Sequence, residues 1–195
     1  MYIVCLVLGY FLGNVQFAVI LSRLLYHDDV REHGSGNAGS TNMLRVFGLK
    51  SGLLTFLGDF LKGLAAVLIG RSLGGELGGY AMALGAVLGH DFPALLKFRG
   101  GKGVASTLGA IWAIHPLFGA ITTAVGVGVV VLTKMVSVGS LVGGSLFLTL
   151  SLCFGADIWQ RLLALCLWLL IVLRHLENLA RIRTGQESKI SLKNK

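Results

Sequence analysis

The sequence predicts an all-α polytopic membrane protein with about seven transmembrane helices. Charged residues make up only 13% of the chain, against about 25% in a typical soluble domain. The mean hydropathy is +0.78, and apolar runs of membrane-spanning length recur along the whole chain. Glycine is abundant at 28 residues, which is typical of transmembrane helices that pack closely.

Each apolar run is assigned to a helix because a span needs about 20 predominantly apolar residues. We expect all of them to belong to a single domain, 1–195. The apolar run at 104–114 is too short to cross a bilayer alone at about 1.5 Å per residue. The other expected spans are 2–25, 53–70, 77–96, 117–133, 135–154 and 158–173.

The number of spans depends on the stretch 104–133, which contains His115 and Pro116. A single long helix kinked at Pro116 gives six spans, whereas two helices that meet there give seven. With seven, one side of the membrane collects 14 of the 17 Lys and Arg residues, all except Lys62, Arg71 and Arg161. The positive-inside rule therefore favours seven helices, with the N-terminus outside and the C-terminus in the cytoplasm.

The polar stretch 33–45 is the first candidate binding site, and this topology places it on the cytoplasmic side. Its glycines allow successive N–H groups to point at one place, which suits an anion. Its hydroxyl, amide and guanidinium groups add donors for phosphate or carboxylate. The candidate residues are Ser35, Gly36, Asn37, Gly39, Ser40, Asn42 and Arg45.

A second polar stretch, 97–107, combines basic residues with a glycine loop that leads into the short helix at 104–114. The N-terminus of a helix after such a loop favours phosphate. A Walker A loop is excluded, because Leu96 occupies the position of its first glycine and Gly103 follows the lysine. The candidate binding residues are Lys97, Gly100, Gly101, Lys102, Gly103 and Ser106.

The third stretch begins the C-terminal tail, where polar residues three and four apart share one helical face. His175 and Asn178 lie one turn apart, so both can point into one pocket and are candidate catalytic residues with Ser35. Glu177 can pair with Arg174 or with Arg181, and we expect these three residues to support the site.

Metal and cofactor chemistry is not expected. The chain has nine carboxylates and no cluster of them suited to a divalent cation. No histidine is followed after four residues by aspartate, so the His-x4-Asp arrangement of one large acyltransferase class is absent. The net charge of +8 suits anionic lipids or substrates, and we expect no nucleic-acid partner.

Taken together, the three stretches resemble the motifs of the bacterial acyl-phosphate:glycerol-3-phosphate acyltransferases. The resemblance runs from end to end and includes length and hydropathy. It departs only at Ser106, where threonine is common. The matching residues are Ser35-Gly36-Asn37-x-Gly39-Ser40-x-Asn42, Lys97-Phe98-x-Gly100-Gly101-Lys102-Gly103-Val104-Ala105-Ser106 and Arg174-His175-x-Glu177-Asn178-x-x-Arg181-x-x-x-Gly185.

The resemblance implies a multi-pass inner-membrane enzyme of phospholipid synthesis. Such an enzyme moves a fatty acyl group from acyl phosphate to glycerol 3-phosphate, giving lysophosphatidate and phosphate. Its expected partners are these two substrates and the lipid bilayer, and the soluble enzyme that makes acyl phosphate is a further candidate.

The residues leave two questions open. The general base is either His175 or a phosphate of the donor, whose second pKa is about 6 in phosphate monoesters. Two alternative functions are an anion transporter and a non-catalytic membrane subunit that docks an acidic partner. A transporter would be expected to show an inverted repeat or a polar midplane path, of which only Asp59 and Lys62 are candidates.

Overall fold

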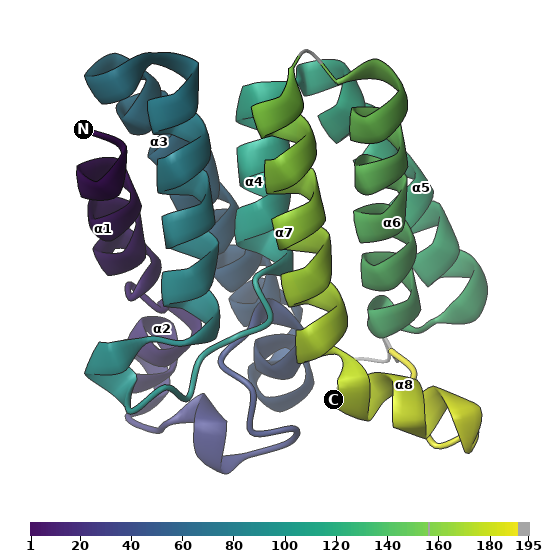
Figure 1. Cartoon of the computed structure of the whole chain (residues 1–195). Helices are drawn as coiled ribbons and strands as arrows, with labels where there is room; N and C mark the ends of the chain where they lie inside the picture. The colour runs from purple at the N-terminus through teal and green to yellow at the C-terminus, as the bar shows by residue number, and fades with distance from the viewer. Residues whose placement is uncertain (156, 191–195) are drawn as a thin grey trace.

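The computed structural model describes residues 1–155 and 157–190, and all regular elements in this part are helical, as predicted (Figure 1). Ala156 and residues 191–195, the end of the expected cytoplasmic tail, lie outside the described part. The elements are α1 (Tyr2–Gly13), α2 (Phe17–Tyr26), η1 (Val30–Glu32), α3 (Ser40–Asp91), η2 (Ala94–Leu96), α4 (Val104–Ile114), α5 (Pro116–Thr133), α6 (Val136–Phe154), α7 (Ile158–Arg174) and α8 (Leu176–Arg183).

Helix α3 consists of three helical segments separated by glycines with non-helical backbone. Gly48 adopts φ 85° and Gly75 adopts φ 64°, a region that glycine enters without steric cost. The segments are 40–47, a long arm 49–73 and a returning arm 76–91. The long arm contains the predicted span 53–70. The returning arm corresponds to the predicted span 77–96, but its helix ends at Asp91 rather than at residue 96.

The first predicted span, 2–25, is not one continuous helix, because the chain leaves helical geometry between α1 and α2. The side chain of Gln16 donates to the carbonyls of Gly13 and His90, at 3.2 and 3.0 Å. Lys62 Nζ donates to the carbonyls of Gly13 and Val15, at 3.3 and 2.6 Å. Tertiary donors thus satisfy the carbonyls that the interruption exposes.

The stretch 104–133 forms two helices, the arrangement that the seven-helix interpretation requires. The backbone is extended at His115, with φ −147°, and α5 begins with Pro116 as its first residue. Proline is favoured there because its missing N–H would have no partner within the helix. Arg71 donates to the carbonyls of Ala113 and Ile114 at the end of α4, at 2.6 and 3.3 Å.

Glycines bring the helices into close contact. A Cβ at Gly85 or Gly89 would lie 2.1 Å from the carbonyl oxygen of Leu6 or 2.0 Å from that of Tyr10, so this face of the returning arm packs directly on α1. Gly63 of the long arm packs in the same way on the backbone of α4. Only glycine permits these helix separations.

A buried ionic cluster joins the two arms of α3 at the end near the polar stretches. Lys62 Nζ lies 2.8 Å from Asp59 Oδ1 and 2.8 Å from His90 Nδ1. All three residues are less than 5% exposed. Asp59 and Lys62 lie three residues apart on the long arm, and His90 joins them from the other arm.

Four stretches of the described part are long and apolar enough to cross a membrane: Tyr2–Tyr26, Ser40–Leu96, Pro116–Thr133 and Val136–Phe154. The pair α7 and α8, bent by 56°, would make a fifth. The stretch Ser40–Leu96 folds back at Gly75 and so supplies two antiparallel arms (Figure 1). The count of seven spans and their orientation stay predictions.

Cysteine labelling tests this topology. In a background without native cysteines, a membrane-impermeant maleimide added to intact cells should label Ser72→Cys beside the turn of α3. It should not label Ser35→Cys or Gln186→Cys, because the basic connections are retained inside. All three positions are exposed, so accessibility within the protein is matched. Labelling of Gln186→Cys together with Ser72→Cys would contradict the seven-helix topology.

Candidate active site

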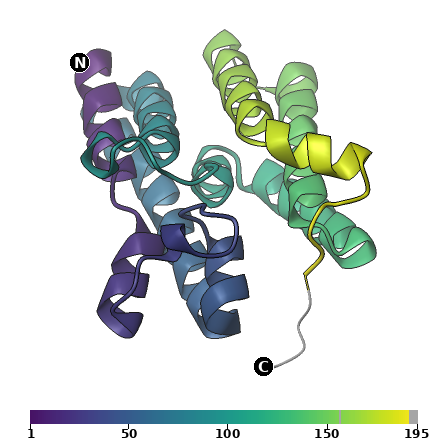
Figure 2. The same ribbon diagram turned by 90° about the horizontal axis from the view of Figure 1, so that it is seen from below.

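The three predicted stretches lie at the same end of the helix bundle, as Figure 2 shows from below. Arg31, just before the first stretch, connects to the second: it donates to the carbonyl of Leu96 at 3.3 Å, and Arg99 of the second stretch donates to the carbonyl of Arg31 at 3.2 Å. The second stretch contacts the third through a hydrogen bond from Lys102 Nζ to Asn178 Oδ1. Segments that are far apart in sequence therefore form one polar surface.

The glycine loop, residues 100–103, packs tightly on the end of the returning arm. The Gly101 N–H donates to the His90 carbonyl at 3.0 Å. A Cβ would lie 2.0 Å from His90 Nε2 at Gly101 and 2.1 Å from the His90 carbonyl at Gly100. These glycines are therefore required for packing against His90. The Gly101 N–H is therefore not free to donate to a phosphate, and the binding role expected of this loop stays a prediction.

The N-terminus of α4 faces a carboxylate of the protein itself. Gly103, with φ 66°, precedes α4, and a Cβ there would lie 2.8 Å from Asp91 Oδ1. Asp91 is 0% exposed. Ser106 is fully buried with its backbone against Gly63, so its hydroxyl does not reach the polar surface.

Lys102 projects from the glycine loop toward α8. Burial lowers its pKa to about 8, together with the positive charge of Arg181, and the charge of Glu187 partly offsets this. Its Nζ donates to Asn178 Oδ1, and Asn178 Nδ2 donates to Glu187 Oε1 at 2.6 Å. Both polar atoms of the Asn178 amide thus have protein partners, and the amide positions Lys102.

Glu187 is the centre of this polar cluster, and sequence reasoning missed it. Its side chain is 3% exposed and accepts from Ser137 at 2.7 Å and from Arg181 Nε at 2.9 Å, in addition to Asn178. Burial raises the pKa of Glu187, but the hydrogen bonds from Ser137, Asn178 and Arg181 outweigh it and hold the pKa below its usual value. Glu187 therefore remains ionised and ties the chain after α8 to the start of α6.

Arg174, Glu177 and Arg181, the expected supporting residues, make different contacts from those predicted. Arg174 donates twice to the Gly101 carbonyl, at 3.1 and 2.8 Å, and its guanidinium lies 5.2 Å from the centre of the Phe92 ring. Glu177 is 88% exposed and approaches Arg181 at 3.8 Å. Of the two predicted pairings of Glu177, the structure has the one with Arg181. An exposed pair of this kind contributes little stability.

His175 lies at the junction of α7 and α8. Its Nδ1 is 2.8 Å from the Ile171 carbonyl, and because a carbonyl only accepts, Nδ1 carries the proton. The neutral ring therefore has its lone pair on Nε2. Burial lowers the pKa of His175 to about 4, and the charge of Lys102 contributes, so the ring is neutral near pH 7.

Asn42 organises the first polar stretch. It is 1% exposed, its Oδ1 accepts from the Ser35 N–H, and its Nδ2 donates to the carbonyls of Val30 and His33, all at 3.0 Å. The Asn42 side chain, predicted to bind substrate, thus holds the loop together through these hydrogen bonds. Gly34 and Gly36 turn the chain there with positive φ. The Ser35 side chain is left exposed.

The remaining predicted residues of this surface are accessible. Arg45 and Lys97 are exposed, and Asn37 and Ser40 are partly buried. Helix α3 begins after Gly39 without a capping side chain. The first N–H groups of α3 therefore have no side-chain cap, as an anion site requires.

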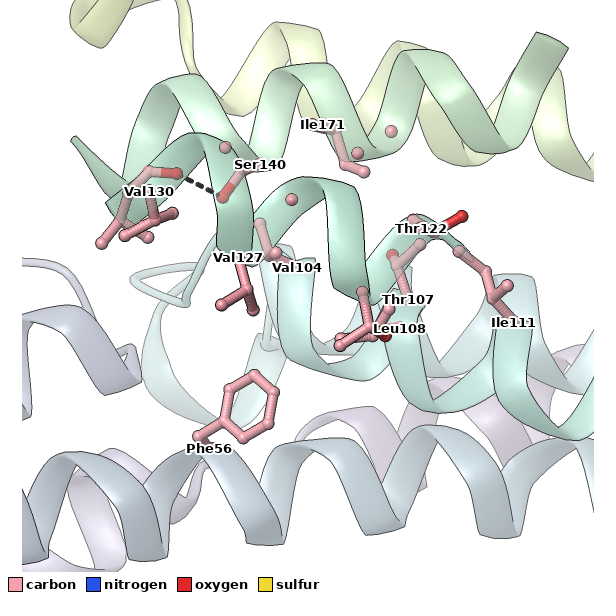
Figure 3. A pocket seen from close by; sticks show the side chains of 16 residues that line it. Phe56, Val104, Thr107, Leu108, Ile111, Thr122, Val127, Val130, Ser140 and Ile171 are labelled. Carbon is pink, nitrogen blue, oxygen red and sulfur yellow. Dashed lines mark hydrogen bonds between the residues drawn. The ribbon is translucent and has the colours of Figure 1, made fainter. Parts of the chain in front are cut away.

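An apolar cavity of about 220 Å³ adjoins the polar surface (Figure 3). Thr122 is 5% and Ile111 is 1% exposed, whereas Phe56 and Val127 are 37% and 56% exposed, so one side is open. The cavity is lined by Phe56, Val104, Thr107, Leu108, Ile111, Thr122, Thr123, Gly126, Val127, Val130, Val136, Gly139, Ser140, Gly143, Gly144 and Ile171.

A family model described as glycerol-3-phosphate acyltransferase matches residues 3–185. The chain belongs to this family. Relatives named glycerol-3-phosphate acyltransferase include one from Thermoanaerobacter pseudethanolicus, 42% identical over 96% of this chain and 94% of its own. Another, from Thermus thermophilus, is 41% identical over 95% of this chain and 93% of its own.

Two solved structures of PlsY (YgiH), an integral membrane glycerol 3-phosphate acyltransferase, share the fold. The glycerol 3-phosphate form superposes with a TM-score of 0.91 at 32% identity, covering 97% of this chain and 96% of that one. The lysophosphatidic acid form gives 0.87 at 33% identity, covering 98% and 96%. The present chain is therefore an integral membrane acyltransferase, and the two non-enzymatic alternatives are set aside.

The pH dependence of this glycerol-3-phosphate acyltransferase tests the role of Lys102. Because the pKa of Lys102 is about 8, its charge is lost as the pH rises through that value, and affinity for an anionic substrate should fall with it. The kcat/KM profile, which reports the free enzyme, should show a basic limb near pH 8. Lys102→Arg stays charged and should remove this limb, whereas Lys189→Arg at an exposed site should retain it. Persistence of the limb in Lys102→Arg would assign it to another group.

Proposed function

We propose that this enzyme uses acyl phosphate as the donor and the sn-1 hydroxyl of glycerol 3-phosphate as the acceptor. The hydroxyl oxygen attacks the acyl carbon, the bond from that carbon to the phosphate oxygen breaks, and the hydroxyl proton passes to a phosphate oxygen. The products are 1-acyl-glycerol 3-phosphate and inorganic phosphate. No metal, cofactor or acyl-enzyme is required, because the donor is already activated.

The observation that carries this proposal is the direct junction of a basic polar cluster with an apolar cavity. Val104, in the cavity wall, lies two residues after Lys102, and Ile171 contributes its side chain to the wall and its carbonyl to His175. Val136 lines the cavity beside Ser137, which bonds Glu187. A molecule with a phosphate head and an acyl tail matches this arrangement.

Holding two phosphates close together is the main electrostatic task. Lys102, the exposed Arg45 and the uncapped start of α3 supply positive charge and N–H donors. Placing hydroxyl and acyl carbon in register can contribute much of the rate acceleration. The Ser35 N–H already donates to Asn42, so it is not available to the oxyanion that develops during the reaction. The exposed Ser35 hydroxyl can donate to that oxyanion instead.

The donor phosphate is the proposed general base. The pKa of His175, about 4, makes its ring a weak base near neutral pH. The second pKa of a phosphate monoester is about 6, so a substrate phosphate is better matched to the reaction. His175 then positions the acceptor by accepting a hydrogen bond at Nε2 from its other hydroxyl, which leaves the proton of the attacking hydroxyl free to pass to the phosphate. Asn178 acts through Lys102.

We place this reaction in the inner cell membrane, at its cytoplasmic face. The basic connections support that side, and the lateral opening beside Phe56 and Val127 gives an amphiphilic donor access from the lipid. The soluble enzyme that makes acyl phosphate is the proposed partner for donor supply.

A direct assay distinguishes the donors. Purified enzyme in lipid nanodiscs should release phosphate from hexadecanoyl phosphate, and form lysophosphatidate, only when glycerol 3-phosphate is present. Hexadecanoyl-CoA should give no product. Labelled hexadecanoyl phosphate alone should leave no acyl group on Ser35. Product from the CoA ester but not from the acyl phosphate would overturn the proposed donor, and a competent acyl-Ser35 adduct would overturn the direct attack.

His175→Asn separates orientation from proton transfer. The asparagine amide can still donate to the Ile171 carbonyl, but it cannot act as a base. We expect a loss in kcat below the ~10²–10⁴-fold typical of a missing general base. The acidic limb of the pH–rate profile should persist near the phosphate pKa of about 6. Disappearance of that limb in His175→Asn would identify the imidazole as the base.

A further inference from the structure

The apolar cavity has a defined long axis because its wall residues recur at helical spacing. On α4 they are Val104, Thr107, Leu108 and Ile111, and on α6 they run from Val136 to Gly144. Residues three and four apart lie on one helix face, so each helix contributes one stripe. Figure 3 shows Val104, Leu108 and Ile111 following one another along the cavity.

The two ends of this axis differ in chemistry. Val104 and Val136 lie beside Lys102 and Ser137, so this end adjoins the polar cluster. Seven residues further along each helix, Ile111 and Gly143 line the opposite end. At about 1.5 Å per residue, seven residues span about 10 Å. An extended chain of 1.5 Å carbon–carbon bonds advances about 1.3 Å per carbon, so about eight carbons cover this distance.

Gly143 keeps the far end open. A Cβ there would lie 3.5 Å from Thr122 Cγ2, 3.7 Å from the Thr122 carbonyl and 4.0 Å from Gly126 Cα, which are ordinary van der Waals distances. At Gly139 a Cβ would instead meet Val130 Cγ2 at 2.4 Å, and at Gly144 it would meet Ile171 Cδ1 at 3.0 Å. Among these three α6 glycines, Gly143 alone accepts a Cβ without displacing a neighbour.

We propose that Gly143 is a specificity-determining residue that sets how long an acyl chain the enzyme accepts. The inference rests on the proposed function, in which the acyl chain occupies this cavity. A side chain at position 143 would fill the far end and stop the chain about eight carbons from the polar cluster. A long chain would then have to leave early through the opening beside Phe56 and Val127.

The test compares kcat/KM for hexadecanoyl phosphate and octanoyl phosphate in one preparation, so that the ratio does not depend on the folded fraction. The ratio should fall stepwise in Gly143→Ala, Gly143→Val and Gly143→Leu. We expect at least a ~10-fold fall for leucine, since small volume changes in an apolar pocket discriminate by about 10–200-fold. If Gly143→Leu does not fold, the comparison of Gly143→Ala and Gly143→Val with the unsubstituted enzyme is sufficient.

Gly128→Leu on α5 is the matched control, because a Cβ at Gly128 meets no atom within 4 Å and Gly128 does not line the cavity. It should leave the ratio unchanged. An unchanged ratio in active Gly143→Val and Gly143→Leu variants would overturn the role of Gly143 and leave the proposed function intact. Failure of the unsubstituted enzyme to use either acyl phosphate would overturn the proposed function, and this inference with it.

Discussion

The arrangement of the active end depends on the buried ammonium of Lys62. It contacts Asp59 and His90 on the two arms of α3 and donates to the carbonyls of Gly13 and Val15 between α1 and α2. A buried carboxylate and two exposed helix carbonyls would be costly in apolar surroundings without a shared partner. The same histidine supports the glycine loop through its carbonyl and its ring. One cation thus couples the helix interruption, the crossing of the arms and the position of the loop.

Hydropathy and charge were sufficient to predict the helical class and most helix positions, because a bilayer admits only helices or closed barrels and requires long apolar runs. The interruption between α1 and α2 could not be predicted locally. Asn14 and Gln16 are compatible with a continuous span, and what favours the break is Lys62, which is distant in sequence. The end of the returning arm at Asp91 does have a local signal, because Pro93 disfavours helical geometry at Phe92.

Within the candidate site, the three stretches predicted from the sequence lie at one end of the bundle, but the contacts of several residues could not be predicted. Glycines next to a lysine suggest phosphate binding, whereas Gly101 is needed for contact with His90. An isolated Glu187 in a basic tail and an isolated Ser137 in an apolar helix carry no local signal of a shared hydrogen bond. Their roles follow from folding, which brings α6 and the chain after α8 together. Lys102 is a candidate from the sequence alone because its charge and its place in the glycine loop are local features.

The negative charge of Glu187 allows the positive side chains of Lys102 and Arg181 to lie near each other in a partly buried position. Their mutual repulsion and burial lower the pKa of Lys102, and the carboxylate limits this effect while fixing Arg181 and Asn178. In the proposed function, a phosphate bound at this surface would relieve the remaining repulsion, so we expect binding of the head group to depend on the charge of Lys102. The apolar cavity gains free energy from burial of a tail regardless of pH. In this proposal head group and tail contribute separately: the glycine loop selects for charge, and the α5–α6 wall around Gly143 selects for chain length.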